Sequence, residues 1–257
     1  VGRWGRPLLR LAARLLPRHA PRIAALARMV PATLPSARAA IKPGTYGAEG
    51  VEIRRVALLT GCVQAVLAPD IDTATLRLLR RHGCTVVVPP PAAGCCGALP
   101  HHLGKGAPAR VLAQRNLGAW RELVRTGSAL AVDTLVMTAS GCGSHLKDYG
   151  HLLPDDPAAA ALASRVKDLS QLLDELSATT PLRVAPNIGN GLILAWQSPC
   201  SLQHGFNEKS APIKVLQACG FEVRQPQNPH LCCGSAGTYN LLQPAFAERL
   251  GRDKAQA

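Results

Sequence analysis

Short apolar runs alternate along the chain with longer stretches in which apolar and polar residues follow a helical period. The predicted strands cover residues 56–60, 85–88, 130–138, 192–197 and 221–224. A helix is expected at 109–124, between the second and third of these strands, and helical spacing also appears near the last residues, at Ala245, Leu250 and Lys254. Strands that alternate with helices are typical of a parallel sheet, so the expected fold class is α/β. No apolar run approaches the roughly 18 residues that span a bilayer.

Cysteines occur at nearly the same spacing in both halves of the chain. Cys62 is followed 33 positions later by the triplet CCG at 95–97, and Cys200 is followed 32 positions later by the triplet CCG at 232–234. A predicted strand precedes each of these cysteine groups. The pattern indicates an internal duplication and predicts two pseudo-repeated Rossmann-like lobes with parallel sheets.

The cysteines also follow the predicted strands at a consistent place. The third strand of the first half runs directly into Cys142, and parallel sheets place their ligand sites beyond the carboxyl ends of the strands. The candidate cofactor and metal ligands are Cys62, Cys95, Cys96, Cys142, Cys200, Cys232 and Cys233. We expect the sulfur atoms of each half to converge on one crevice.

The repeat and the distribution of charge divide the chain into three predicted parts. Residues 1–48 carry eight arginines and Lys42 but no acidic residue, and form a predicted basic helical linker or docking arm. Residues 49–185 form the first cysteine-rich lobe and 186–257 the second, which is expected to be truncated at its C-terminus. The repeat spacing predicts a closing cysteine for the second lobe at roughly 270 to 280.

The cysteine count favours metal ligation over a disulfide scaffold. The chain has nine cysteines, which is an odd number, two pairs are adjacent, and no signal peptide is visible. Thiolates suit iron in sulfide clusters, and four of them satisfy a cubane cluster. Tetrahedral zinc also accepts four thiolates, so zinc remains an alternative, although the wide spacing differs from paired CxxC knuckles.

Other polar and sulfur-bearing residues are interpreted as structural. Cys84 and Cys219 lie outside the repeat and are expected to fill the core. His145 and His204 follow Cys142 and Cys200 closely, and although outer-shell roles stay open, a surface or loop position is favoured. No flavin or nicotinamide fingerprint and no nucleophile with a positioned base is evident, so we expect no catalytic residue on this chain.

Four strings of residues carry a resemblance to a known family. They are GCCG at 94–97, ASGCG at 139–143, SPCSLQH at 198–204 and HLCCGSAGTY at 230–239. Most of residues 50–257 thereby closely resembles the glycolate oxidase iron–sulfur subunit family. The duplicated cysteine-rich CCG region of that family is shared with lactate-utilisation proteins and with the heterodisulfide reductase B subunit. One departure is Ala139, which stands where the heterodisulfide reductase pattern closes with CxxC, and it argues against a five-thiolate noncubane cluster in the first half.

The resemblance implies an electron-transfer role in an oxidoreductase. A partner subunit containing FAD would oxidise glycolate to glyoxylate, and this chain would relay the electrons through iron–sulfur clusters, with 4Fe–4S as the favoured type, towards a membrane or quinone acceptor. The same resemblance implies a ferredoxin-like domain with two 4Fe–4S clusters outside this sequence. It also implies a cytoplasmic location, peripheral at the inner membrane.

Three alternatives stay open on the sequence alone. The cysteines would instead support a zinc-stabilised interaction scaffold without electron transfer, or the corresponding subunit of a lactate or glycerol-3-phosphate oxidoreductase. The arginine-rich arm would allow nucleic-acid binding, but without interleaved aromatic residues it makes a poor surface for stacking bases, and no nucleic-acid partner is expected.

Overall fold

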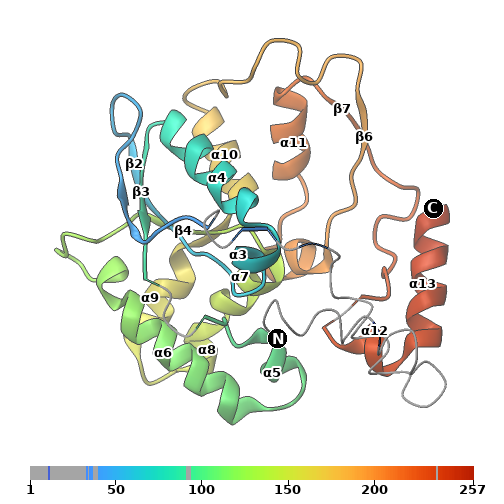
Figure 1. The fold of residues 1–257 in the computed structure, drawn as a ribbon, viewed down its shortest axis with the longest axis horizontal. Coiled ribbons are helices and arrows are strands. Elements are labelled where there is room, and N and C mark those ends of the chain that lie inside the picture. Colours follow the sequence, from blue (N-terminus) through green and yellow to red (C-terminus); the bar gives the residue numbers. More distant parts are fainter. Residues whose placement is uncertain (1–10, 12–32, 34, 37–39, 91–93, 236) are drawn as a thin grey trace. The chain divides into compact units, whose positions relative to one another are not determined.

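A computed structural model of the chain describes residues 11, 33, 35–36, 40–90, 94–235 and 237–257 (Figure 1). The chain divides into a larger compact unit, Ala37–Pro229, and a smaller unit that contains His230–Ala257. Most of the predicted basic helical arm lies outside the described residues, and the three-part division predicted from the sequence stays a prediction.

A five-stranded sheet forms the centre of the larger unit, with the strand order β1-β3-β2-β4-β5. Its strands are β1 (Gly44–Tyr46), β2 (Arg54–Leu58), β3 (Cys84–Val88), β4 (Thr134–Met137) and β5 (Val166–Asp168). The four strands β3, β2, β4 and β5 run parallel, and β1 pairs antiparallel with β3 at one edge. The α/β fold class predicted from the sequence is confirmed.

Helices cover both faces of this sheet (Figure 1). The described helices of the larger unit are α3 (Gln64–Leu67), α4 (Pro69–Arg81), α5 (Ala98–His102), α6 (Gly106–Val124), α7 (Ser140–Lys147), α8 (Tyr149–Leu152), α9 (Pro157–Arg165), α10 (Leu169–Ser177) and α11 (Ala211–Ala218). One turn of π-helix, Ser201–Gly205, follows Cys200. Within the described ranges, no helix combines the length and apolar character needed to cross a bilayer.

The alternation of side chains along the strands divides the core into two layers. Val56, Val86 and Val136 pack with leucines of α4 and α10 on one face. Their neighbours, including Ala57 and Leu135, pack with residues of α6, α7, α8 and α9 on the other face. Because successive residues of a strand point to opposite faces, a strand covered on both sides is apolar at nearly every position. This explains why the central strands read as continuous apolar runs.

A second, two-stranded parallel sheet contains β6 (Ile193–Ala195) and β7 (Glu222–Arg224). These strands lie 137 to 139 residues after the matching parts of β2 and β3, in the same parallel arrangement. In the smaller unit, α12 (Tyr239–Leu242) and α13 (Pro244–Gln256) follow the second pair of cysteines. The duplication inferred from cysteine spacing therefore extends to the strands.

The structure also differs from the predicted elements at three places. The strand expected at 130–138 is shorter, because residues 130–133 form a turn and connection before β4. Strand β1 lies inside the range predicted to be a helical arm. The sequence analysis did not predict β5 and α10, where Asp168 caps the helix and Gln171 completes a reciprocal capping box.

Leu135→Ala is expected to lower the free energy of unfolding by about 2 to 5 kcal/mol, because it leaves a cavity beside the buried strand β4. Leu135 is fully buried, whereas Leu130, five residues earlier, is 44% exposed and lies in a turn. The matched variant Leu130→Ala should change stability by no more than about 0.5 kcal/mol. Chemical denaturation followed by circular dichroism measures both, and equal losses would contradict the assigned core.

Candidate metal centre

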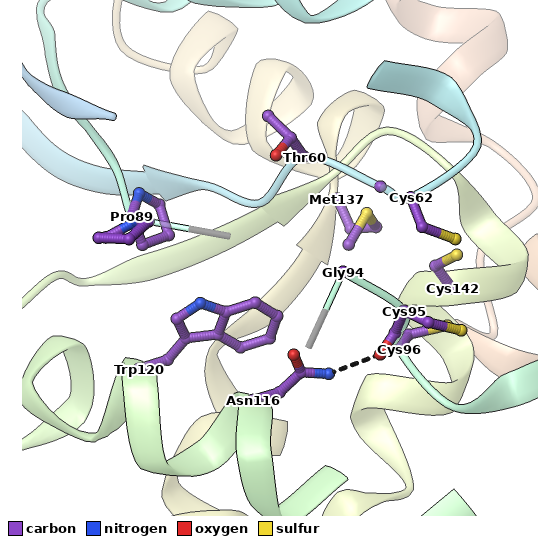
Figure 2. Close-up of a pocket in the computed structure, with 12 residues that line it drawn as sticks. Thr60, Cys62, Pro89, Gly94, Cys95, Cys96, Asn116, Trp120, Met137 and Cys142 are labelled. Carbon is purple, nitrogen blue, oxygen red and sulfur yellow. Dashed lines mark hydrogen bonds between the residues drawn. The ribbon is translucent and has the colours of Figure 1, made fainter. Parts of the chain in front are cut away.

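Three loops at the carboxyl edge of the main sheet bring four cysteines together. Cys62 lies four residues after β2 ends, the pair Cys95 and Cys96 follows β3, and Cys142 lies in the first turn of α7 after β4. All four line one pocket, with Trp120 and Met137 among its other walls. Figure 2 shows the cysteine sulfur atoms gathered on one side of this pocket. The predicted convergence of the first set is what the structure shows.

The four thiols interact as two hydrogen-bonded pairs. Burial raises the pKa of Cys62, and repulsion from Cys95 and a hydrogen bond to it raise this pKa further. Cys96 donates a hydrogen bond to Cys142, which raises the pKa of Cys96, and burial adds to this effect. The same hydrogen bond lowers the pKa of Cys142.

This electrostatic arrangement favours a cation. Negative charge on Cys62 and Cys95 opposes ionisation of Cys142, so four thiolates repel one another at this site. A bound cation removes that repulsion, because it stabilises every thiolate that it contacts. Positive charge between the four sulfur atoms would therefore favour the deprotonation of all four thiols.

A tight turn presents the adjacent cysteines in both copies of the repeat. Gly97 has a φ of 94° and Gly234 a φ of 78°, which is a backbone conformation that favours glycine. The N–H of Gly97 donates to Sγ of Cys95 at 3.4 Å, and the N–H of Gly234 donates to Sγ of Cys232 at 3.4 Å. The two turns therefore have the same local geometry around the first sulfur atom.

Each of these turns packs against the second helix after it, α6 in the first repeat and α13 in the second. A Cβ atom added to Gly97 would lie 3.1 Å from the carbonyl oxygen of Ala109 in α6. A Cβ atom added to Gly234 would collide with the carbonyl oxygen of Ala247 in α13. Ala109 and Ala247 are 138 residues apart, within one residue of the spacing between the glycines. The contact between turn and helix is thus repeated as well as the cysteines.

His145 does not lie where the sequence analysis favoured placing it. The expected surface or loop position is wrong, because His145 lies in α7 and is 4% exposed. Burial lowers its pKa to about 4, and the neighbouring His101 lowers it further. Its Nε2 is buried without a hydrogen-bond partner among the described residues and lies 3.3 Å from the position of a Cβ atom on Gly97. A neutral imidazole therefore borders the cysteine turn.

The element that carries Cys142 packs closely against the element that carries Cys200. A Cβ atom on Gly143 would lie 2.5 Å from the ring of Phe206, and one on Gly205 would collide with Ser144. The hydroxyl groups of Ser140 and Ser201 share a hydrogen bond of 2.7 Å. Helix α7 of the first repeat and the π-helical turn of the second are therefore in direct contact.

The remaining cysteines occupy different environments. Cys200 is exposed in the larger unit, and Cys232 and Cys233 are exposed in the smaller one, so their convergence stays a prediction. Cys84 is fully buried in β3, where burial raises its pKa to about 11, and Cys219 ends α11 half-buried. Four other histidines near the cysteine loops are exposed, namely His101, His102, His204 and His230.

The donor set of the first site fits a polynuclear centre. A tetrahedral zinc ion requires four sulfur atoms at about 2.3 Å from one point. In the described part of the chain, no three histidine, cysteine or acidic side chains gather at the spacing of a single ion. In a cubane cluster each thiolate binds its own iron, so the four sulfur atoms stand further apart than around a single zinc ion. The cavity beside the sulfur atoms measures about 30 Å³, so the two thiol pairs have to part before a cluster fits.

Fold and site together define a duplicated cysteine-rich α/β protein that presents thiol ligands at the carboxyl edge of a parallel sheet. The family described as "CCG: Cysteine-rich domain" matches residues 56–147 and 194–257. The chain belongs to this family. The two matched segments contain all seven of the predicted ligands.

Curated relatives agree with the resemblance drawn from the sequence. The chain is 39% identical over 204 residues to the glycolate oxidase iron–sulfur subunit of Escherichia coli (strain K12), covering 79% of this chain and 49% of that protein. It is 33% identical to the probable glycolate oxidase iron–sulfur subunit of Bacillus subtilis (strain 168), covering 79% and 45%. It is 26% identical to lactate utilization protein A of Shouchella clausii (strain KSM-K16), covering 77% and 80%. The chain thus spans about half the length of the two glycolate oxidase relatives.

Gly143→Ala is expected to destabilise the contact between α7 and the π-helical turn by about 1 to 3 kcal/mol, because an added methyl group overlaps Phe206. Gly141, in the same helix, has no atom within 4 Å of an added Cβ and provides the matched control. Gly141→Ala should be neutral or stabilise the helix by up to about 1 kcal/mol. Urea denaturation of both variants checks the difference, and equal effects would argue against the close contact.

Proposed function

We propose that this chain carries iron–sulfur centres and relays electrons as a subunit of a glycolate-oxidising complex. The observation that carries the proposal is the gathering of Cys62, Cys95, Cys96 and Cys142 around one pocket, from three loops far apart in the sequence. Glycine turns, N–H donors to sulfur and hydrogen bonds between thiols surround these cysteines. Packing of cysteines as core residues would not require these features. The names of the relatives support iron and sulfide as the partner of these thiols.

Different residues of the chain would ligate such a centre, donate hydrogen bonds to its ligands and limit its contact with water. A cluster of this kind supplies reversible one-electron chemistry when it is bound. The four thiols supply the ligands, and the N–H of Gly97 supplies a hydrogen bond to Cys95 that stabilises negative charge on sulfur. The neutral His145 and the indole of Trp120 border the site and limit the access of water. Oxidation of the substrate would take place on the partner subunit and not on this chain.

Contact between the two repeats supports a relay within one chain. Cys142 and Cys200 lie on elements that pack together through Gly143, Phe206 and the Ser140–Ser201 hydrogen bond. Cys200 would join Cys232 and Cys233 to hold the second centre. Electrons entering at one centre would then pass to the other across a packed protein contact.

The rest of the complex is part of the same proposal. A partner subunit containing FAD would oxidise glycolate to glyoxylate, and a ferredoxin-like domain with two further 4Fe–4S clusters would connect it to this region. The final acceptor would be a quinone or another membrane carrier, with the complex in the cytoplasm against the inner membrane. The higher identity to glycolate oxidase subunits than to lactate utilization protein A favours glycolate as the substrate of the complex.

Anaerobic reconstitution with iron and sulfide should give a coloured protein whose visible absorbance bleaches on reduction. Cys96→Ala should remove the first centre, because Cys96 is a proposed ligand and its thiol is buried on the pocket wall. Cys84→Ala removes an equally buried thiol that lies outside the repeat, and this variant should keep its full iron and sulfide content. Iron and sulfide analysis with electron paramagnetic resonance measures the difference.

Two outcomes would overturn this proposal. A wild-type chain that stays colourless and takes up no stoichiometric iron or sulfide would not be an electron carrier. A chain that instead binds zinc, without any redox-dependent absorbance, would be the zinc-stabilised scaffold that the sequence left open.

Glycolate should reduce the reconstituted centres when the flavoprotein subunit and the ferredoxin-like domain are both present, and it should not reduce them when the flavoprotein subunit is left out. We expect reduction to be faster with glycolate than with lactate or glycerol 3-phosphate at equal concentration. Stopped-flow absorbance in the visible range measures the three rates. Faster reduction by lactate would reassign the complex to the lactate alternative.

A further inference from the structure

Two buried side chains donate hydrogen bonds to the backbone carbonyl groups of the first cysteine pair. Nδ2 of Asn116 donates to the carbonyl oxygen of Cys95 at 2.9 Å and to the hydroxyl oxygen of Tyr149 at 3.0 Å. The hydroxyl of Tyr149 in turn donates to the carbonyl oxygen of Cys96 at 2.7 Å. Figure 2 shows the bond from Asn116 to Cys95 at the edge of the pocket. We call Asn116 and Tyr149 the carbonyl clamp.

The carbonyl clamp lies where water does not supply these hydrogen bonds. Asn116, in the middle of α6, is 1% exposed, and Tyr149, at the start of α8, is fully buried. Both are surrounded by the apolar layer that contains Leu117 and Leu146. A buried carbonyl without a donor is strongly unfavourable, so the cysteine pair depends on these two side chains for its conformation.

The clamp also determines where the peptide N–H groups point. In a planar trans peptide, the C=O and the following N–H point in opposite directions. With its oxygen turned inward to Tyr149, the peptide that joins Cys96 to Gly97 directs its N–H outward, where it reaches Sγ of Cys95. A flipped peptide would present a carbonyl oxygen to the thiolates instead of a donor.

We propose that Asn116 and Tyr149 are positioning residues that fix the two peptides of the cysteine pair so that N–H groups, and not carbonyl oxygens, face the first metal centre. The effect of these N–H groups on the reduction potential of the centre rests on the proposed function. The orientation of the two peptides does not rest on it, because the same hydrogen bonds form in the chain without metal. Donors directed at thiolate sulfur favour the more negative, reduced state of a centre, so the clamp raises its reduction potential.

The second copy of the repeat provides an internal comparison. At the spacing that relates Ala109 to Ala247, the position that corresponds to Asn116 is Lys254. Cys232 and Cys233 are exposed, whereas Cys96 is buried. The printed hydrogen bonds of Asn116 and Tyr149 go to the carbonyl oxygens of the first turn. Changes to the clamp should alter the first centre and leave the second unchanged.

The first test uses the full chain without metal. Tyr149→Phe removes one hydroxyl, and Tyr46→Phe is the matched control, because the Tyr46 hydroxyl donates to the carbonyl of Lys42 at an exposed site. Hydrogen–deuterium exchange of the segment 94–98 should accelerate about five- to hundredfold in Tyr149→Phe, the range expected for loss of a donor to a buried carbonyl. Segments in β2 and β4 measure any general loss of stability, and exchange at 94–98 should rise beyond theirs. Tyr46→Phe should leave 94–98 unchanged.

If Tyr149→Phe does not fold, Asn116→Ser tests the same inference. This variant removes the amide that reaches Cys95 and should give faster exchange at 94–98 by the same comparison. Exchange at 94–98 that rises no more than in β2 and β4 would overturn the clamp for either variant. Because no metal is present, this result does not depend on whether the chain carries an iron–sulfur centre.

The second test uses the reconstituted chain. In Tyr149→Phe the reduction potential of the first centre should become more negative and its paramagnetic resonance signal should shift, while the second centre and the Tyr46→Phe control keep their wild-type values. An unchanged potential and signal for the first centre would overturn the redox role of the clamp. Failure of the wild type to take up iron and sulfide would instead refute the proposed function, and the exchange result would stand.

Discussion

The common direction of three neighbouring strands is the constraint on which the site depends. Strands β3, β2 and β4 lie side by side and parallel, so their carboxyl ends reach the same edge of the sheet. Each is followed by a loop that carries cysteine, and sulfur atoms 80 residues apart in the sequence thereby line one pocket. A sheet with alternating directions would have sent one of these loops to the opposite edge. Both faces of the sheet are packed with helices, so its edge is the place left for ligands.

Around that edge, the backbone contributes as much to the chemistry as the thiols do. Repulsion between thiolates disfavours their ionisation. The N–H of Gly97 donates to Sγ of Cys95 and stabilises negative charge on that sulfur atom before any cation binds. The N–H faces the sulfur because the carbonyls of the cysteine pair are held on the other side by Asn116 and Tyr149. Electrostatics, glycine conformation and core packing therefore act on the same short segment.

The sequence predicted the features that repeat or alternate and missed those that depend on contacts across the chain. Parallel strands and the convergence of the first four cysteines followed from apolar runs and spacing. Strand β1 was missed because its three residues carry no apolar alternation. Asn116 and Tyr149 lie 21 and 53 residues from their carbonyl partners, on helices where they resemble ordinary inward-facing positions. Only the folded chain brings their donors under the cysteine pair, and the same holds for the burial of His145.

The repeated contact between a glycine and an alanine carbonyl has an evolutionary consequence. Gly97 meets Ala109, and Gly234 meets Ala247, at almost the same separation in each half. A contact shared by both descendants of a gene duplication was present in their single-copy ancestor. In that ancestor the cysteine turn already packed against a helix. The two halves have since diverged in their surroundings while inheriting one way of presenting sulfur.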